Sequence, residues 1–252
     1  MFISRLGVSY RIDGDVVRGR FVAGDYTRVP ETRLVRAGVL VTVADVVAGW
    51  GANRVVFPRI PLTLDLTVRR LRPIEAGDGA EMDITARVLK AGVTTVVSEV
   101  VFADAASGEA VVMSHATFIN SPRPEDEFTE PLPARTHPSS LTRPIMQDIG
   151  ASVVAPGVAQ LARVPYVLQP AGTIQGGAVG LLAELAAESF AAAPIADLEL
   201  RYLATIRIGP AVATASAVSP DLVRVEVRDA GRPERLAALA MARPAFSRTA
   251  AR

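Results

Sequence analysis

The stretch QPAGTIQGGAVGLLAELAAES, residues 169–189, places two adjacent glycines before a segment rich in alanine and leucine, with Glu184 inside that segment. Glycine pairs weaken helices, and carboxylates are rarely found on apolar helix faces. A helix that accepts both features indicates a need for accessible backbone N–H groups at its start and for an acid close by. The stretch therefore points to chemistry around a buried helix.

The chain contains a second copy of this pattern. RAGVLVTVAD (residues 36–45) resembles QGGAVGLLAE (residues 175–184), because each has a polar residue, a small pair, an apolar run and an acid nine positions on. Downstream, VRRLRPIEAG (residues 68–77) resembles LRYLATIRIG (residues 200–209) at a constant offset, 200 − 68 = 132. Such internal repetition predicts a duplicated structural unit.

Each copy continues with three segments that have strand character and are separated by turn residues. They are residues 80–92, 94–104 and 110–119 in the first copy, and residues 211–218, 222–229 and 235–246 in the second. The last segment has helical propensity, but its match to residues 110–119 favours a strand. We predict an α+β fold with a first unit over residues 1–120, a proline-rich linker over 121–150 and a second unit over 151–252. In each unit a curved antiparallel sheet wraps a central helix, and the two sheets join edge to edge.

Composition excludes several classes of protein. The 252 residues are 50% hydrophobic with a net charge of +1, and they contain no cysteine and two histidines. We therefore expect no thiolate chemistry, no metal site and no nucleic-acid partner. The N-terminus has no features of a signal peptide, and the apolar run at residues 37–50 is short and contains Asp45. These features predict a cytoplasmic protein with no membrane partner.

The run QP-x-G-x-x-QGG, followed by an apolar helix that carries an acid, resembles the hotdog-fold acyl-CoA thioesterases of the phenylacetate-pathway and 4-hydroxybenzoyl-CoA branches. The first copy matches only in its glycine, apolar run and acid. Two copies in tandem resemble a double hotdog, in which two hotdog units follow each other in one chain. The resemblance implies hydrolysis of an acyl-CoA substrate without a cofactor, coenzyme A being part of the substrate. It also implies assembly into a homodimer or a higher homo-oligomer.

The resemblance further implies that each site is shared between two units. An acid on one helix acts as nucleophile or general base, and a backbone amide at the start of the other helix polarises the thioester carbonyl. The expected catalytic residues are the two acids, the amide and a side-chain amide just upstream: Asp45, Glu184, Gly176 and Gln169. The expected substrate-binding residues are those at the two helix starts and an aromatic side chain at the end of the first helix: Gln175, Gly177, Arg36, Ala37 and Trp50.

Spacing gives an independent reason for sharing. Gly176 and Glu184 are eight residues apart, which is about 12 Å along a helix axis, so one carbonyl cannot contact both. We predict one competent site that combines Asp45 with Gln169, Gln175 and Gly176. The other combination, Glu184 with Arg36 and Ala37, is predicted to be impaired, because a proline occupies the position of Gln169 and alanine replaces the first glycine.

Several alternatives stay open at the level of sequence. Asp45 could be a buried acid paired with Arg33 or Arg36, and Gln169 could serve only to hold its loop. The arginines of VRRLRP (residues 68–73) could bind coenzyme A phosphates or form a solvated face. A non-catalytic acyl-CoA-binding or sensing protein is the alternative function. A hotdog hydratase is disfavoured, because no histidine lies near either helix start.

Overall fold

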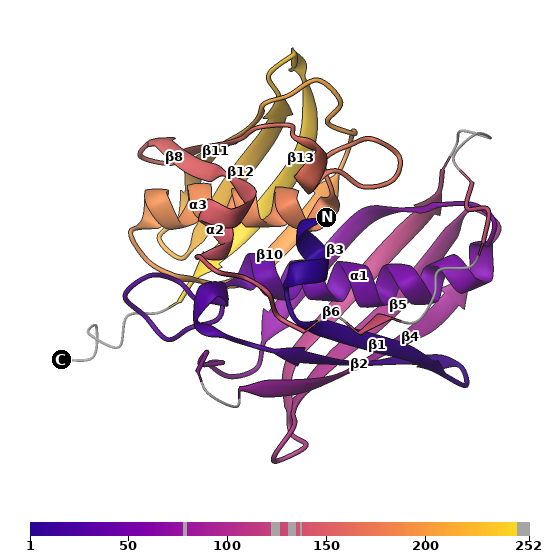
Figure 1. The fold of residues 1–252 in the computed structure, drawn as a ribbon. Helices are drawn as coiled ribbons and strands as arrows, with labels where there is room; N and C mark the ends of the chain where they lie inside the picture. The colour runs from indigo at the N-terminus through magenta and orange to yellow at the C-terminus, as the bar shows by residue number, and fades with distance from the viewer. Residues whose placement is uncertain (78–79, 122–126, 131–134, 137, 246–252) are drawn as a thin grey trace.

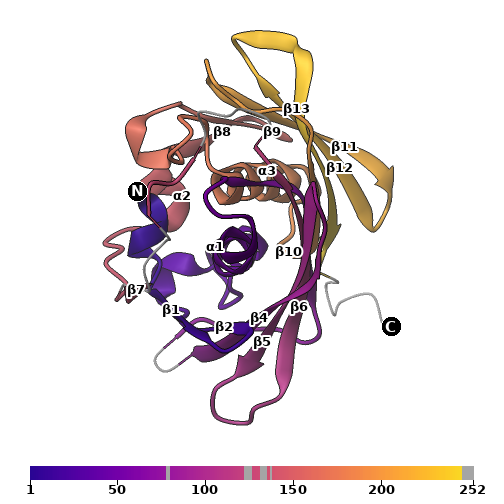
Figure 2. The same cartoon turned by 90° about the vertical axis from the view of Figure 1, so that its right-hand side faces the viewer.

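A computed structural model describes residues 1–77, 80–121, 127–130, 135–136 and 138–245 of the chain. Its two long helices, α1 (Ala37–Val56) and α3 (Gly176–Ala191), are those that the repeat predicts. Nearly every residue in the first two turns of each helix is buried within the chain. Figure 2 shows both helices side by side within the curve of one sheet.

Thirteen strands of the described residues form this sheet. The first unit contributes β1 (Val8–Asp13), β2 (Val16–Val22), β3 (Pro61–Arg70), β4 (Glu81–Ala91), β5 (Thr95–Asp104) and β6 (Ala110–Asn120). The second contributes β8 (Ala151–Ala155), β9 (Val158–Leu161), β10 (Ile195–Tyr202), β11 (Ala211–Ser219), β12 (Leu222–Asp229) and β13 (Arg232–Pro244). All six strand segments predicted from the sequence are present, including the last one, whose composition favours a helix.

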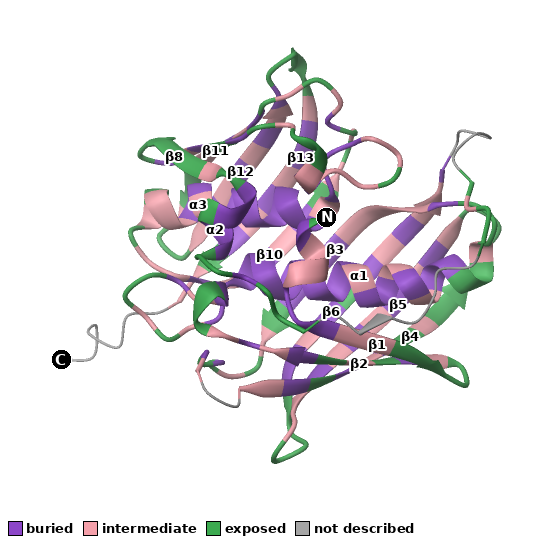
Figure 3. Ribbon diagram, in the orientation of Figure 1, coloured by how far each residue is buried: buried purple, intermediate pink, exposed green. Residues whose placement is uncertain are grey.

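The two halves meet where β3 pairs with β10 in antiparallel register, with Leu66 opposite Leu200. This pairing covers an edge strand of each half, as predicted, and makes the sheet continuous through the molecule (Figure 1). Strand β12 alternates strictly between buried and partly exposed residues, and β5 does so up to its last two residues. Their buried side chains face the helices, which Figure 3 shows as largely buried.

Helices α1 and α3 pack closely through small residues. A Cβ atom added to Gly177 would lie 2.5 Å from Thr42 Oγ1, and one added to Gly38 would lie 2.8 Å from the Cα of Leu181. Later residues of α3 therefore meet earlier residues of α1, so the helices are antiparallel. This orientation brings the start of each helix towards the middle of the other.

Helix α1 is longer than the apolar run seen in the sequence. By length and composition it could cross a membrane, but 67% of its most apolar window is buried inside the protein, as in a core helix.

The predicted linker contains two short elements. Strand β7 (Arg135–Thr136) pairs with β1, and helix α2 (Ile145–Ile149) ends at Gly150, whose φ of 76° suits glycine. Ile145 and Ile149 of this helix are buried, which explains why the segment folds despite its charged surroundings. Residues 122–126, 131–134 and 137 of the linker lie outside the described residues.

Candidate active site

Asp45 lies in the middle of α1, with only 8% of the residue exposed. Its Oδ1 accepts a hydrogen bond from the hydroxyl of Thr63 at 2.7 Å, and its Oδ2 accepts one from Nε2 of Gln175 at 3.0 Å. Thr63 belongs to β3 of the same unit, whereas Gln175 directly precedes α3 of the other unit. The carboxylate is therefore held at the junction of the two halves.

No described arginine forms an ion pair with Asp45. Arg33 pairs with Glu75 and Arg36 with Glu188, so the alternative of an Asp45–arginine pair is wrong. Burial without a cation raises the pKa of Asp45 to about 6, although the hydrogen bonds from Thr63 and Gln175 lower it in part. A carboxyl with this pKa can exchange protons with a reacting group near neutral pH.

The start of α3 lies directly beside this carboxylate. A Cβ atom added to Gly176 would be 3.1 Å from Asp45 Oδ2 and 3.4 Å from the hydroxyl of Tyr202. Within the described part of the chain, no residue accepts a hydrogen bond from the N–H of Gly176. This donor sits at the positive end of a helix, where it suits an oxygen that develops negative charge.

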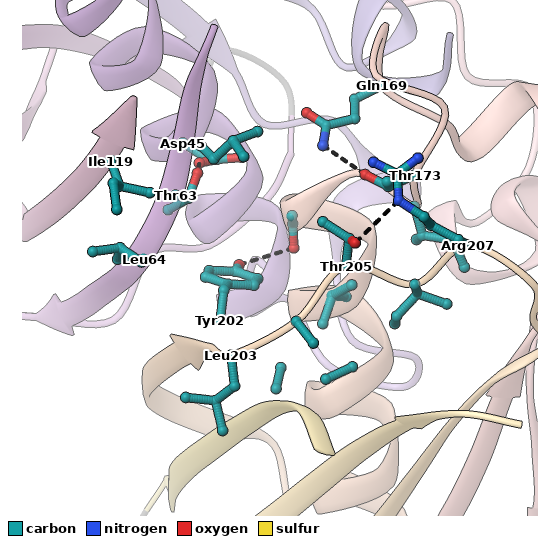
Figure 4. A pocket seen from close by; sticks show the side chains of 18 of the residues that line it. Asp45, Thr63, Leu64, Ile119, Gln169, Thr173, Tyr202, Leu203, Thr205 and Arg207 are labelled. Carbon is teal, nitrogen blue, oxygen red and sulfur yellow. Dashed lines mark hydrogen bonds between the residues drawn. The ribbon is translucent and has the colours of Figure 1, made fainter. Parts of the chain in front are cut away.

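The turn before α3 is fixed by amide side chains. Gln175 caps the helix, because its Oε1 accepts from the N–H of Ala178 at 3.1 Å while its Nε2 bonds Asp45. Gln169 donates from Nε2 to the hydroxyl of Thr173 at 2.6 Å, and it also lies on the cavity wall (Figure 4). Gln169 thus holds its loop and faces the cavity at once, so the two readings of this residue do not exclude each other.

Tyr202 is a site residue that the sequence reasoning missed. Its hydroxyl donates to the carbonyl oxygen of Gly176 at 2.9 Å, and it lines the same cavity as Asp45 (Figure 4). Tyr202 ends β10, and at the offset of 132 its counterpart in the first unit is Arg70 (202 − 132 = 70). The exchange of arginine for tyrosine inside the repeat was the signal that could have revealed it.

Two cavities meet at Asp45, Thr63 and Gln169. The first, of about 490 Å³, follows α1 into the first unit and is mainly apolar; we call it the apolar cavity. Its walls include Ile3, Leu6, Val46, Trp50, Phe118 and Phe128. The second, of about 330 Å³, opens over the second unit and is called the mouth cavity. Its walls include Thr173, Gly176, Tyr202, Thr205, Arg207 and Arg235.

Trp50, named from the sequence among the substrate-binding residues, is buried and lies on the wall of the apolar cavity. It packs edge-to-face against Tyr10 with ring centroids 4.8 Å apart, which fixes the position of the indole.

Residues 35–111 match the family model of the thioesterase superfamily. This match places that segment in the thioesterase superfamily. It bears out the resemblance seen in the sequence and the predicted class of enzyme, a thioester hydrolase. Among curated proteins, no match to the sequence was found.

Two solved structures resemble this chain over nearly its whole length. An acyl-ACP thioesterase from Bacteroides thetaiotaomicron VPI-5482 is 14% identical with a TM-score of 0.63, and the alignment covers 91% of this chain and 97% of that chain. A 12:0-ACP thioesterase from Umbellularia californica is 13% identical with a TM-score of 0.66, covering 93% of this chain and 100% of that chain. At these identities the comparisons show a shared fold, the thioesterase fold with its large antiparallel sheet.

The second acid of this thioesterase fold has a different environment. Glu184 is fully buried, and its two oxygens accept from the backbone N–H groups of Ala37 at 2.6 Å and Gly38 at 3.1 Å. Arg36 Nη1 lies 3.6 Å from Glu184 Oε2 and 2.7 Å from Glu188 Oε2. The predicted combination of Glu184, Arg36 and Ala37 therefore forms, but Glu184 already occupies the helix start that a thioester carbonyl would need.

Three predicted substrate-binding residues are corrected by these contacts. The side chain of Arg36 is only 4% exposed and is held in the ionic cluster, and Ala37 is fully buried. Gly177 is buried beneath Thr42 and lines neither cavity. Each is committed to packing between the helices, so none of the three contacts the cavities that meet at Asp45.

The arginines of residues 68–73 are also engaged elsewhere. Arg69 pairs with Glu199, and Arg72 pairs with Glu109. Arg70 donates to the carbonyl oxygens of Val35 and Ile195, inside the protein. Burial lowers the pKa of Arg70, while the nearby charge of Glu184 opposes this shift. The reading of these residues as coenzyme A ligands is therefore not supported.

Proposed function

We propose that this chain is an acyl-CoA thioesterase with one competent site, shared between the two units of a double hotdog. The observation that carries the proposal is the position of Asp45, from the first unit, against the start of α3 in the second unit. Both lie at the junction of the apolar cavity and the mouth cavity. If the thioester group of the substrate lies at this junction, its acyl chain extends into one cavity and its coenzyme A arm into the other.

The chemistry follows from these positions. The carbonyl oxygen of the thioester accepts a hydrogen bond from the N–H of Gly176, which stabilises the oxyanion as the carbon becomes tetrahedral. Ionised Asp45 either takes a proton from the attacking water or attacks the carbon itself; both routes require the same carboxylate. The C–S bond then breaks, the thiolate takes a proton, and water supplies the second oxygen of the free acid. This reaction uses no metal or redox cofactor. We also propose that the protein acts in the cytoplasm.

Comparison of the two acids tests the proposal. Thiol release should be measured on a series of saturated acyl-CoA substrates for the wild type, Asp45→Asn and Glu184→Gln. Loss of a general base or nucleophile predicts a fall in kcat/KM of about 100-fold or more for Asp45→Asn. Glu184→Gln should keep most of its turnover per folded molecule, because Glu184 is sealed from both cavities.

The reverse ranking would contradict the assignment of the site, provided that circular dichroism shows both variants folded. The alternative function, an acyl-CoA-binding or sensing protein, would be indicated by tight binding of acyl-CoA with no thiol release at any chain length.

A further inference from the structure

The mouth cavity is continuous with a smaller recess of about 60 Å³, the arginine recess, lined by Arg207, Arg232 and Arg235 together with Thr205 and Asp229. Arg207, Arg235 and Thr205 belong to the walls of both spaces. Three guanidinium groups therefore surround the outer end of a path that leads to Asp45. Nothing in the thioester chemistry at Asp45 uses them.

Two of these arginines have no acidic partner among the described residues. Arg232 and Arg235 are exposed at the start of β13, and neither forms an ion pair there. Glu234 lies between them in sequence but lines neither the recess nor the mouth cavity. Most other arginines at the surface of this protein do pair with a carboxylate, as Arg69 and Arg201 both do with Glu199.

The one acid that lines the recess, Asp229, already accepts hydrogen bonds on both carboxylate oxygens. Asp229 accepts hydrogen bonds from the backbone N–H groups of Arg207, Ile208, Gly209 and Gly231 at 2.6 to 3.1 Å. Burial raises the pKa of Asp229, but these four bonds outweigh it and hold the pKa below its usual value. Because its oxygens accept from the backbone, Asp229 braces the loop before β11 and forms no ion pair with Arg232 or Arg235.

Arg207 is oriented by its neighbours. Its Nε donates to the hydroxyl of Thr205 at 3.3 Å (Figure 4). Its Nη1 donates to the carbonyl oxygen of Ala171 at 3.4 Å. Ala171 lies in the turn that carries Gln169, so the arginine links the recess to the wall of the site. Arginine with this kind of support is well suited to bind the oxygens of a phosphate.

The recess also lies away from the reacting centre, towards solvent. Tyr202, whose hydroxyl touches the start of α3, pairs with Ala238 of β13. Arg235 precedes Ala238 by three residues, which amounts to about 10 Å along a strand. A ligand with a thioester at Asp45 and an anion in the recess must therefore carry the two groups at opposite ends of an extended arm.

We propose that Arg207, Arg232 and Arg235 form a phosphate-binding cluster that holds the phosphate of a phosphopantetheine arm while its thioester reaches Asp45. The inference rests on the proposed thioesterase function and deepens it, because it names the chemical group by which the carrier is recognised. The same phosphate ester occurs in coenzyme A and on acyl carrier proteins. The cluster also fixes the orientation of the substrate: the carrier arm occupies the mouth cavity, and the acyl chain occupies the apolar cavity.

The test compares substrates that differ only in the phosphate. Decanoyl-pantetheine and decanoyl-4′-phosphopantetheine share the acyl chain and the thioester, and decanoyl-CoA and a decanoyl-acyl carrier protein represent the two natural sources. We expect the double variant R232A/R235A to lose about tenfold or more in kcat/KM on the phosphate-carrying thioesters, mainly through KM, because charge-assisted hydrogen bonds are lost. On decanoyl-pantetheine, which carries no phosphate, its kcat/KM should fall much less, so that the preference of the wild type for the phosphorylated thioester is lost.

Two controls sharpen the result. Arg87→Ala removes an exposed arginine of β4 that lines neither the mouth cavity nor the recess, and it should leave all four substrates unaffected. The variant R232K/R235K should keep part of the phosphate preference, because charge is retained but the planar fork is lost. Equal losses on pantetheine and phosphopantetheine thioesters, or no loss on any substrate, would overturn the proposal.

The natural carrier follows from the same data. A phosphate-dependent loss on both decanoyl-CoA and the acyl carrier protein thioester supports the shared group, and the larger wild-type kcat/KM identifies the carrier.

Failure of the proposed function would look different. If the wild type released no thiol from any of the four thioesters, hydrolysis would be excluded while the cluster could still be examined by calorimetry with 4′-phosphopantetheine and pantetheine. Tighter binding of the phosphorylated compound that is lost in R232A/R235A would then support the phosphate cluster alone. Equal binding of both compounds would overturn it.

Discussion

At the scale of single residues, two carboxylates at corresponding positions of the repeat have opposite surroundings. Asp45 has a hydroxyl and a side-chain amide as its partners and no cation, and burial raises its pKa to about 6. Glu184 has two backbone N–H groups and Arg36. Glu184 is thus enclosed by hydrogen-bond donors and a cation, whereas Asp45 lies beside a cavity without a countercharge, where it can take up a proton.

The pKa of Asp45 predicts the acid limb of the pH profile. Because the active form is the ionised carboxylate, kcat/KM should fall as the pH decreases through about 6. The hydroxyl of Thr63 stabilises this ionised form, so Thr63→Val should raise the pKa of Asp45 and move the limb to higher pH. Thr67→Val, the same change further along β3, is the matched control. A limb that stayed in place in Thr63→Val, or moved to lower pH, would argue against Asp45 as the titrating group.

Some of the site could be predicted at this scale and some could not. Asp45, Gly176 and Gln175 belong to one sequence motif and its repeat, so their roles follow from the family that the motif resembles, and spacing adds that the site is shared between the two units. Thr63 and Tyr202 reach the site from the strands that join the two sheets, and their arrival depends on the register of β3 with β10. The register between strands that are far apart in sequence cannot be predicted from either strand alone. For this reason the sequence did not reveal Thr63 and Tyr202 as site residues.

At the scale of secondary-structure elements, the glycine pair serves two different purposes. Gly176 leaves room for Asp45 and Tyr202, whereas Gly177 lets α3 approach Thr42 of α1. The sequence reasoning assigned both glycines to substrate approach, because it could place α3 but not the surface against which α3 packs. The helices were predictable because the same apolar run with an acid occurs twice in the chain, and the strands because turn residues separate them. Helix α2 was not, because five residues are too few to show a period.

This division predicts different outcomes for two neighbouring substitutions. Gly177→Ala would place a Cβ atom 2.5 Å from Thr42 Oγ1, so the helices must separate, and overpacking of this kind costs about 1–3 kcal/mol of stability. Gly176→Ala would place its Cβ atom 3.1 Å from Asp45 Oδ2, which narrows the space for the thioester carbonyl. We expect thermal unfolding to show the larger loss of stability for Gly177→Ala, and thiol release to show the larger loss of kcat for Gly176→Ala. The opposite ranking in both assays would mean that Gly177, not Gly176, borders the substrate.

At the scale of the whole molecule, the repeat forms two related junctions, in each of which the start of one helix meets an acid of the other helix. Among the described residues, the apolar cavity and the mouth cavity border one of these junctions, which we call the open junction, and the other is the closed junction. Around the start of α3 lie Asp45 and Tyr202, with two cavities beside them. Around the start of α1 lie Glu184 and the guanidinium of Arg36. Arg70 lies close enough for the charge of Glu184 to oppose the lowering of the Arg70 pKa by burial. The closed junction fixes the two halves against each other, and this rigid contact positions Asp45 and α3 at the open junction.

This view predicts that Glu184 matters for stability more than for turnover. Glu184→Gln leaves buried Arg36 without one of its anions and sets an NH2 group against a backbone N–H at the start of α1. Breaking a buried ion pair on one side typically costs about 3–5 kcal/mol, so the free energy of unfolding in urea should fall by that order. Turnover per folded molecule should stay close to that of the wild type.

Glu188→Gln supplies the comparison within the same cluster. Burial and the charge of Glu184 raise the pKa of Glu188 to about 7, although Arg36 opposes this shift, so Glu188 ionises less readily than an exposed glutamate. Replacing Glu188 by a neutral amide at pH 7 should therefore cost less stability than Glu184→Gln. Since a raised folded-state pKa means that ionisation of Glu188 destabilises the fold, the loss of stability in Glu188→Gln relative to the wild type should shrink as the pH rises from 6 to 8. Equal losses for both variants across that range would show that Glu184 is not the main anion holding the two halves together.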